Sequence, residues 1–274
     1  MKRTFEQIVK YIILVFFALL ILFPVYMVIS GSFKTEFELY SNVFGFPDTV
    51  SFKNYVTAFI DGNLKNYFMN SVVVTVCSVI LIVLLSSMAA FALARLKVRF
   101  HNAIYRLFIL GIAIPAQVGI IQLSLMMSKL HLTNSLFGLI LVYIAFELPF
   151  SVFVFYGYLQ TFPNEIQEAA IVDGCNKWQL YWNVIMPLCK NSIATVVIFD
   201  LVAVWNDVLF PLVLISKEKL RTLPYGLMQF RGQYSARYTV IFAGVIIITI
   251  PLTALYLCMQ KQFISGLTQG AVKG

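Results

Sequence analysis

The sequence is poor in charged residues. Only 12% of its 274 residues are Asp, Glu, Lys or Arg, whereas a soluble domain carries about 25%. Apolar residues make up 60% of the chain, and the mean hydropathy is +0.86. Polar side chains are therefore too few to cover a water-facing surface of this size. This balance excludes a soluble enzyme, a disordered chain and a secreted disulfide scaffold, and it leaves a protein whose solvent is lipid.

Cysteine is scarce, and metal-ligand spacings are missing. The four cysteines, Cys77, Cys175, Cys189 and Cys258, show no CxxC spacing. We therefore expect small buried hydrophobes here, with no disulfide framework and no metal site. The net charge of +8 would suggest nucleic acid in a soluble protein. Here the basic residues flank long apolar runs, so we expect anionic membrane lipid and no nucleic acid as their partner.

Catalytic motifs are missing as well. The sequence contains no G-x-x-x-x-G-K-[ST] phosphate loop, no H-E-x-x-H and no G-x-S-x-G. His101 and His131 are isolated, each near the edge of an apolar run. We therefore expect no catalytic residue and no cofactor bound by this chain.

Long apolar runs dominate what remains. A membrane span needs about 20 mostly apolar residues, and in lipid it must be helical because its peptide groups have no water to bond. The sequence predicts an all-α polytopic membrane protein with six transmembrane helices. The predicted spans are residues 11–30, 71–94, 105–127, 136–158, 192–215 and 238–260.

These spans divide the chain into a tail (1–10), a first helix (11–30), an outer loop (31–70), a five-helix core (71–260) and a second tail (261–274). Lys2, Arg3 and Lys10 precede the first span, as in a signal sequence, but its apolar stretch is longer than a signal-peptide core and no A-x-A site follows. We expect it to be retained. Six spans place both termini on one side, and the basic residues of the short loop 95–106 favour the cytoplasmic side.

The loop 160–190 has the pattern of a helix with both ends marked. Pro163 suits an early helical position, and Glu165 lies in the first turn, where the helix dipole favours an acid. Ile166, Ala169 and Ala170 share one face, and Gly174 can take the left-handed conformation that ends a helix.

A second short helix is predicted after Gly174. Asn176 is a candidate N-cap, an aromatic stripe begins at Trp178 and continues through Tyr181 and Trp182, and Pro187 is expected to stop the helix. We call residues 160–190 the elbow. From these residues alone two interpretations stay open: an interfacial helix pair that only shortens a long loop, or a docking element for a partner protein.

The elbow resembles the EAA loop of binding-protein-dependent ABC-transporter permeases. The resemblance rests on Glu168-Ala169-Ala170, then Asp173-Gly174, then Ile185-x-Pro187-Leu188. Trp205-Asn206-Asp207-x-Leu209, with segments 221–227 and 266–274, resembles the maltose-permease-like branch for carbohydrate uptake, so the likeness runs over essentially the whole chain.

The resemblance implies a role and a set of partners. The chain would be half of a sugar pathway in a prokaryotic plasma membrane, paired with a second homologous permease, two ATPase subunits that hold ATP and Mg, and an extracytoplasmic solute-binding protein. The elbow and both termini would face the cytoplasm. Glu168 would form a salt bridge to the ATPase, Gly174 would supply the turn, and the remaining coupling residues would be Ala169, Ala170, Asp173 and Pro187.

Candidate substrate contacts are polar groups near or within the spans: Trp205, Asn206, Asp207, Gln117 and Glu147. For Asp207 an internal pairing or helix-capping role stays open, for Glu147 a structural kink beside Pro149, and for Asp200 no role can be chosen.

The loop 216–237 is expected to touch the binding protein through Gln229, Arg231, Gln233 and Tyr234. Rival interpretations are a permease for a non-sugar solute, a stand-alone channel or secondary transporter, and a membrane-embedded enzyme. The sequence does not name the sugar or the companion subunits.

Overall fold

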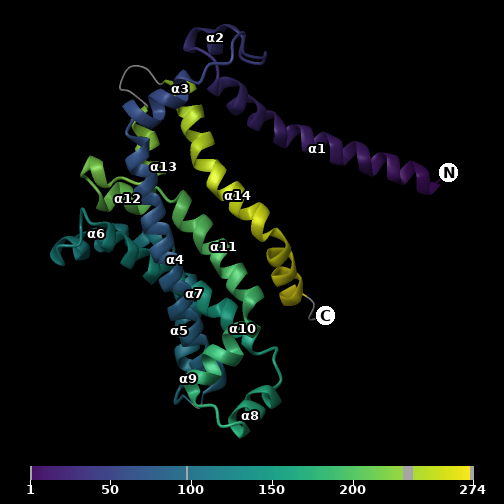
Figure 1. Cartoon of the computed structure of the whole chain (residues 1–274), viewed down its shortest axis with the longest axis vertical. Helices are drawn as coiled ribbons and strands as arrows, with labels where there is room; N and C mark the ends of the chain where they lie inside the picture. The colour runs from purple at the N-terminus through teal and green to yellow at the C-terminus, as the bar shows by residue number, and fades with distance from the viewer. Residues whose placement is uncertain (1, 97, 231–236, 272–274) are drawn as a thin grey trace. The chain divides into compact units, whose positions relative to one another are not determined.

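The computed structural model describes residues 2–96, 98–230 and 237–271, with side chains placed for all of these except residues 2–5, 229, 259 and 261–271. Across these ranges the chain is built of helices joined by short turns, without a strand (Figure 1). The all-α prediction is confirmed. The chain divides into two compact units, Met1–Asn66 with Gly226–Pro251 and Tyr67–Tyr225 with Leu252–Gly274.

Four helices are long and apolar enough to cross a membrane, and the number rises to six if each of two sharply bent helix pairs counts as one span. The pairs are His101–Ile112 with Ala116–Lys129, and Lys177–Leu188 with Lys190–Asn206. The long helices lie where the sequence predicts spans one, two, four and six. They are α1 (Lys2–Ser32), α4 (Leu64–Arg95), α7 (Leu136–Leu159) and α14 (Tyr238–Ala271).

The third predicted span is not one straight helix. It is broken into α5 (His101–Ile112), the 3₁₀ turn η2 (Ala116–Gly119) and α6 (Ile120–Lys129), and the two arms are bent by 86°. Pro115 causes the break, because it has no N–H to donate and it disfavours helical backbone in the preceding residue. Its own backbone is extended, with ψ 132°.

The fifth predicted span is also interrupted. Helix α11 (Lys190–Asn206) ends at Asp207, whose backbone is extended with φ −70° and ψ 135°, and α12 (Leu209–Leu214) follows. The Asp207 carboxylate accepts the backbone N–H groups of Leu209 and Phe210, both at 3.0 Å. A side chain that satisfies the first donors of a new helix favours a restart here over a continuous span.

The first unit holds α1, α2 (Glu36–Ser41), α3 (Lys53–Val56), η1 (Thr57–Asp61), η5 (Met228–Phe230) and the beginning of α14. Its polar centre is Lys34, which is 1% exposed and donates to the carbonyls of Asn42 (2.6 Å) and Gly45 (2.7 Å). Carbonyl acceptors offset part of the cost of burying an ammonium group. The segment that follows α1 therefore folds around the Lys34 side chain.

The second unit is organised around α7, whose buried side chains enter two hydrophobic clusters. One cluster joins α7 to α4 and to the elbow. The other joins α7 to α6, α11 and α12. The remaining short elements of this unit are α8 (Asn164–Val172), α9 (Lys177–Gln179), η3 (Leu180–Ile185), α10 (Met186–Leu188), η4 (Glu218–Leu220) and α13 (Leu223–Leu227), which continues into the first unit.

Candidate functional site

The elbow begins with helix α8, whose end is fixed by a glycine turn. Gly174 has φ 86°, a left-handed conformation that costs a glycine nothing. Its N–H donates to Ile171 O at 3.0 Å, and the N–H of Cys175 donates to Ala170 O at 3.0 Å. This is the Schellman arrangement, which satisfies the last carbonyls of a helix. The sequence prediction of a left-handed Gly174 is confirmed.

The second helix of the elbow starts as the sequence predicts. Asn176 Oδ1 accepts the N–H groups of Trp178 and Gln179, and Gln179 Oε1 accepts the N–H of Asn176 at 2.8 Å, which completes a capping box. The second helix ends at Leu188, one residue after Pro187 and close to the predicted stop. Pro187 lies inside α10, which follows the wide π-helical segment η3, and the turn comes at Cys189.

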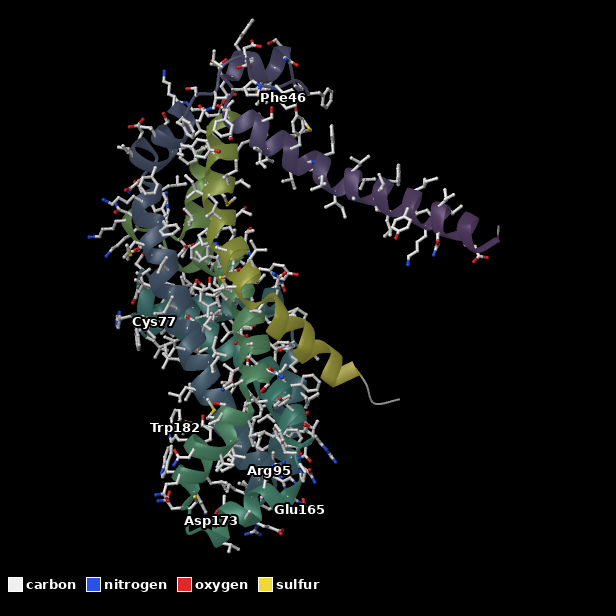
Figure 2. All side chains as sticks on the ribbon, turned by 45° about the vertical axis from the view of Figure 1, so that its right-hand side comes forward. Phe46, Cys77, Arg95, Glu165, Asp173 and Trp182 are labelled. Carbon is white, nitrogen blue, oxygen red and sulfur yellow. The ribbon has the colours of Figure 1, made fainter. Side chains whose placement is uncertain are left out.

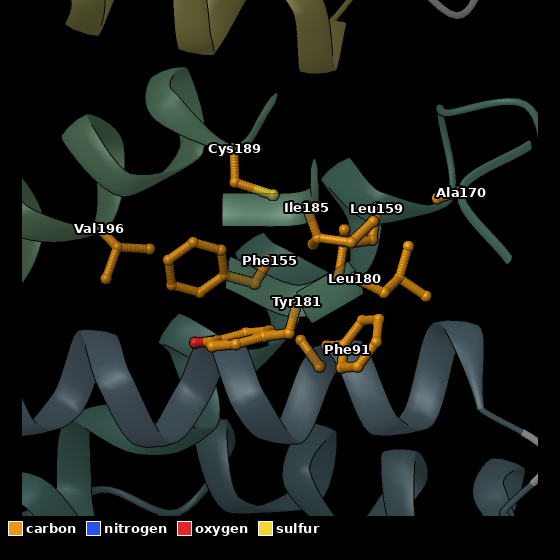
Figure 3. Close-up of a cluster of buried hydrophobic side chains, with 10 residues drawn as sticks. Phe91, Phe155, Leu159, Ala170, Leu180, Tyr181, Ile185, Cys189 and Val196 are labelled. Atoms are coloured by element: carbon orange, nitrogen blue, oxygen red, sulfur yellow. The ribbon is translucent and has the colours of Figure 1, made fainter. Parts of the chain in front are cut away.

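One buried cluster holds the elbow against α4 and α7 (Figure 3). Tyr181 is 2% exposed, and its ring lies 5.5 Å from that of Phe91 on α4. Its hydroxyl shares a 2.7 Å hydrogen bond with Ser87 Oγ. Phe155 and Leu159 of α7 complete the contact. Since protein interiors are close-packed, a displacement of the second elbow helix is transmitted to both long helices.

The opposite face of α8 is open and carries both apolar and acidic groups. Val172 is 86% exposed and Ala169 is also exposed, beside the exposed acids Glu165, Glu168 and Asp173. Figure 2 shows Glu165 and Asp173 at the end of the second unit where Arg95 and Trp182 also lie, with Cys77 farther along α4. The exposed candidates Glu168, Ala169, Asp173 and Gly174 thus lie on α8 and its turn, and the exposed Pro187 lies on α10.

The two alanines of the motif lie on different faces. Ala170 is 8% exposed and belongs to the buried cluster with Leu180 and Leu159. Its small side chain lets α8 approach the second elbow helix. Ala169 is the alanine that lies on the open surface, and a contact between Ala170 and a partner has no exposed surface to form on.

Polar groups cross the interface between α7 and α11. The hydroxyl of Tyr143 donates to Asp207 Oδ2 at 2.9 Å, and Ser151 Oγ donates to Asp200, whose two carboxylate oxygens lie 3.1 and 3.0 Å away. Tyr143, Glu147 and Ser151 are spaced four residues apart, so they share one face of α7. We call Tyr143, Glu147 and Ser151, together with Asp200 and Asp207, the polar ladder. Sequence reasoning placed Asp200 in mid-span but missed its partner, because a single serine in an apolar helix gives no signal.

The substrate candidates do not share one environment. Trp205 is 5% exposed and its ring packs edge-on against Phe68 of α4, with centroids 5.7 Å apart. Asn206 is exposed and donates to Val202 O at 3.0 Å. Glu147 is half-buried on the ladder, and Gln117 is exposed in η2. The Asp207 carboxylate bonds to Tyr143 and to the N–H groups of Leu209 and Phe210. Its contact with a sugar stays a prediction.

Hydrogen bonds to Asn134 and Asn70 hold the first half of the loop after α12 in place. Asn134 Oδ1 accepts the N–H groups of Ser216 (2.7 Å) and Lys217 (2.8 Å). Asn70 Nδ2 donates to the carbonyls of Lys219 and Arg221, both at 2.9 Å. Of the four predicted binding-protein contacts, Arg231, Gln233, Tyr234 and the side chain of Gln229 lie outside the described residues.

No group of three or more His, Cys, Asp or Glu side chains that could hold a metal ion occurs in the part of the chain that the structure describes.

Comparison with known proteins gives one family match. The family model described as "Binding-protein-dependent transport system inner membrane component" matches residues 82–269, a range that contains the whole elbow and the polar ladder.

Curated relatives align over nearly the full chain. The multiple sugar-binding transport system permease protein of Streptococcus mutans is 37% identical, with 96% of each chain covered. The arabinooligosaccharides transport system permease protein of Halalkalibacterium halodurans is 32% identical, with both chains fully covered.

A solved structure has the same fold. It is a chain of a bacterial ABC transporter involved in the import of the acidic polysaccharide alginate, with a TM-score of 0.85 and 24% identity, covering 95% of this chain and 97% of that one.

Proposed function

The chain belongs to the binding-protein-dependent transport system inner membrane components, and we propose that it is the permease subunit of an ATP-driven importer of sugars. The relatives named above are permeases for multiple sugars and for arabinooligosaccharides. The observation that carries the mechanism is the elbow: a short helix fastened from behind by a buried cluster, with an open face that nothing in this chain covers among the described residues.

The open face of α8 is suited to a protein partner. Val172 is 86% exposed beside acidic residues, so this face offers a partner both apolar and charged contacts. We propose that Ala169 and Val172 enter a groove of the ATPase and that Glu168 pairs with a basic residue there. Asp173 and Gly174 shape the turn, and Pro187 lies where the second helix ends.

The partner supplies the chemical step. The sequence contains no phosphate loop, so we propose that ATP and Mg bind to two separate ATPase subunits and that this chain is not itself an enzyme. Closure of the ATPase pair would move α8, and the buried cluster around Tyr181 and Phe155 would pass that movement to α4 and α7.

The pathway would lie along the faces of this chain and of a second, homologous permease. We propose that the polar ladder and the neighbouring Asn206 lie near this pathway, since polar groups inside spans usually face a protein interior or a water-filled cavity. Trp205 and Asp207 would then act by shaping the break between α11 and α12, and Gln117 and Glu147 are candidates for direct contact with sugar.

Orientation follows from the elbow. If α8 meets an ATPase, the elbow and both termini face the cytoplasm, and the opposite loops face an extracytoplasmic solute-binding protein. We propose that loop 216–237 makes that contact. Deleting Gln229–Tyr234 is expected to lower uptake while the ATPases stay bound; their release would contradict this assignment.

The proposed function is tested by transport in proteoliposomes. The chain is co-expressed with its companion permease and ATPases, reconstituted, and supplied with binding protein and radiolabelled sugar. We expect uptake that requires ATP inside and stops when the ATPase is made catalytically inactive. Uptake by this chain alone, without ATP, would instead identify a channel or secondary transporter, and ATP-driven uptake of a non-sugar solute alone would refute the sugar assignment.

A further inference from the structure

Arg95 is the last residue of α4, yet its side chain reaches the start of the elbow. Its guanidinium donates through Nη1 to Asn164 Oδ1 at 2.7 Å, and through Nη2 to the carbonyls of Phe162 at 2.8 Å and of Leu159. Leu159 ends α7 and Asn164 begins α8. One side chain therefore bonds to both sides of the joint between these two helices.

The acceptors explain why an arginine stands here. The last carbonyls of a helix have no partner within it, and the negative end of its dipole attracts a cation. The planar guanidinium presents several donors in a fixed geometry, whereas the ammonium group of lysine is a point charge on a flexible stem. Two backbone carbonyls and one side-chain amide oxygen, on different sides of the joint, suit the fork and not the point charge.

A second bond runs in the opposite direction. Gln167, one turn into α8, donates through Nε2 to the backbone carbonyl of Arg95 at 3.2 Å. The end of α4 and the first turns of α8 are thus tied both by the guanidinium and by the main chain. The two partners are 72 positions apart in sequence, with α5, α6 and α7 between them.

Packing does not fill the space beneath this link. A pocket of about 420 Å³, partly open to the surface, lies between the end of α4 and the elbow, and Arg95, Gln167, Ile171, Cys175 and Lys177 are among its lining residues. A side of α8 that faces a cavity has few atoms through which to push. The hydrogen bonds of Arg95 and Gln167 are therefore the stiff connection between α8 and α4 at this point.

We propose that Arg95 is a positioning residue of the transport cycle that locks α8 to the end of α4, so that α4 moves together with the elbow. This inference rests on the proposed function, and it adds a direct link between α8 and α4 to the indirect one that the buried cluster around Tyr181 provides. Breaking the lock leaves α8 able to bind the ATPase, but its movement then reaches α4 only through the second elbow helix.

The test compares Arg95→Gln and Arg95→Lys with Arg99→Gln in the reconstituted complex. Arg99 is exposed and lies over the Phe100 ring at 4.9 Å, so its substitution makes the same change of charge four residues away. Loss of one hydrogen bond to a charged group changes an equilibrium by about tenfold. We expect both Arg95 variants to retain the ATPase on purification and to lose about tenfold of the stimulation of ATP hydrolysis by loaded binding protein, and Arg99→Gln to behave as the native chain.

A distance measurement separates this role from general destabilisation. Spin labels are placed at Leu85→Cys on α4 and Glu165→Cys on α8, both exposed positions, with Cys77, Cys175 and Cys258 replaced by serine. With Arg95 present we expect one narrow distance distribution that is the same with and without trapped ATP. With Arg95→Gln we expect the distribution to shift or broaden when ATP is trapped.

Unchanged stimulation together with an unchanged distance distribution in Arg95→Gln would overturn the proposal. If Arg95→Gln does not assemble, Arg95→Lys decides, because it keeps the charge and removes the fork of donors: native stimulation in that variant would contradict the lock. Failure of the native chain to retain an ATPase would refute the proposed function itself, and this result is distinct from a native complex in which Arg95 is dispensable.

Discussion

The turn at Gly174 allows a quantitative prediction. With φ at 86° it lies in the left-handed region, where an L-residue pays about 1–2 kcal/mol. A Cβ built on Gly174 meets no atom within 4 Å, so sterics from neighbours add nothing in this chain. Replacement by alanine therefore costs only the free energy of holding an L-residue in the left-handed region, and replacement by a β-branched residue costs more because its side chain crowds the backbone there. The ratio of the bent elbow to other conformations falls by a factor of about 5–30.

The assay is stimulation of ATP hydrolysis by loaded binding protein in the reconstituted complex. We expect Gly174→Val to lose most of it, Gly174→Ala to lose less, and Gly174→Asn to lose least, because asparagine tolerates the left-handed conformation. Gly157→Val is the matched control: a Cβ there also meets nothing within 4 Å, but its φ is not positive. Native coupling in Gly174→Val, or equal damage from asparagine and valine, would refute the conformational reasoning.

Two further substitutions test the packing of the second unit, each through the melting temperature of the purified chain in detergent. Gly138→Ala would place a Cβ 2.1 Å from the backbone carbonyl oxygen of Leu132, so we expect a loss of about 1–3 kcal/mol in the free energy of unfolding. In the control Gly119→Ala the new Cβ meets nothing within 4 Å, and this variant should melt as the native chain does. Equal melting temperatures of the two variants would contradict the close approach at Gly138. Ser151→Ala removes the hydroxyl that donates to the buried Asp200 and should cost about 1–3 kcal/mol; an unchanged melting temperature would show that the carboxylate does not depend on this donor.

Hydropathy predicts the long helices of this fold well but does not predict their breaks. The runs that became α1, α4, α7 and α14 are continuous and apolar, and in lipid such a run has no alternative to a helix. The breaks near Pro115 and at Asp207 depend on single residues. A proline inside an apolar run can end a helix or be accommodated within it, and the surroundings decide which. Helix α7 continues past Pro149, whereas the helix before Pro115 ends.

The local structure of the elbow was predictable because it is encoded locally. Gly174 and the Asn176 cap act on backbone groups within a few residues of themselves. The sequence does not predict which face of α8 is buried. Ala169 and Ala170 are identical residues, and the packing of the second elbow helix determines that Ala170 is the buried one. The link from Arg95 to Asn164 joins residues 69 positions apart, and no periodicity in a single sequence reports such a contact.

The most direct measurement uses these neighbouring alanines. Cysteines introduced at Ala169 and at Ala170 are reacted with a short bifunctional crosslinker in membranes that contain the whole transporter. The account predicts that Ala169→Cys, on the exposed face of α8, crosslinks to the ATPase and that its yield changes when ATP is trapped, while the buried Ala170→Cys does not react. An elbow whose exposed position 169 meets only lipid or water, with the ATPase bound elsewhere on the complex, would contradict the account.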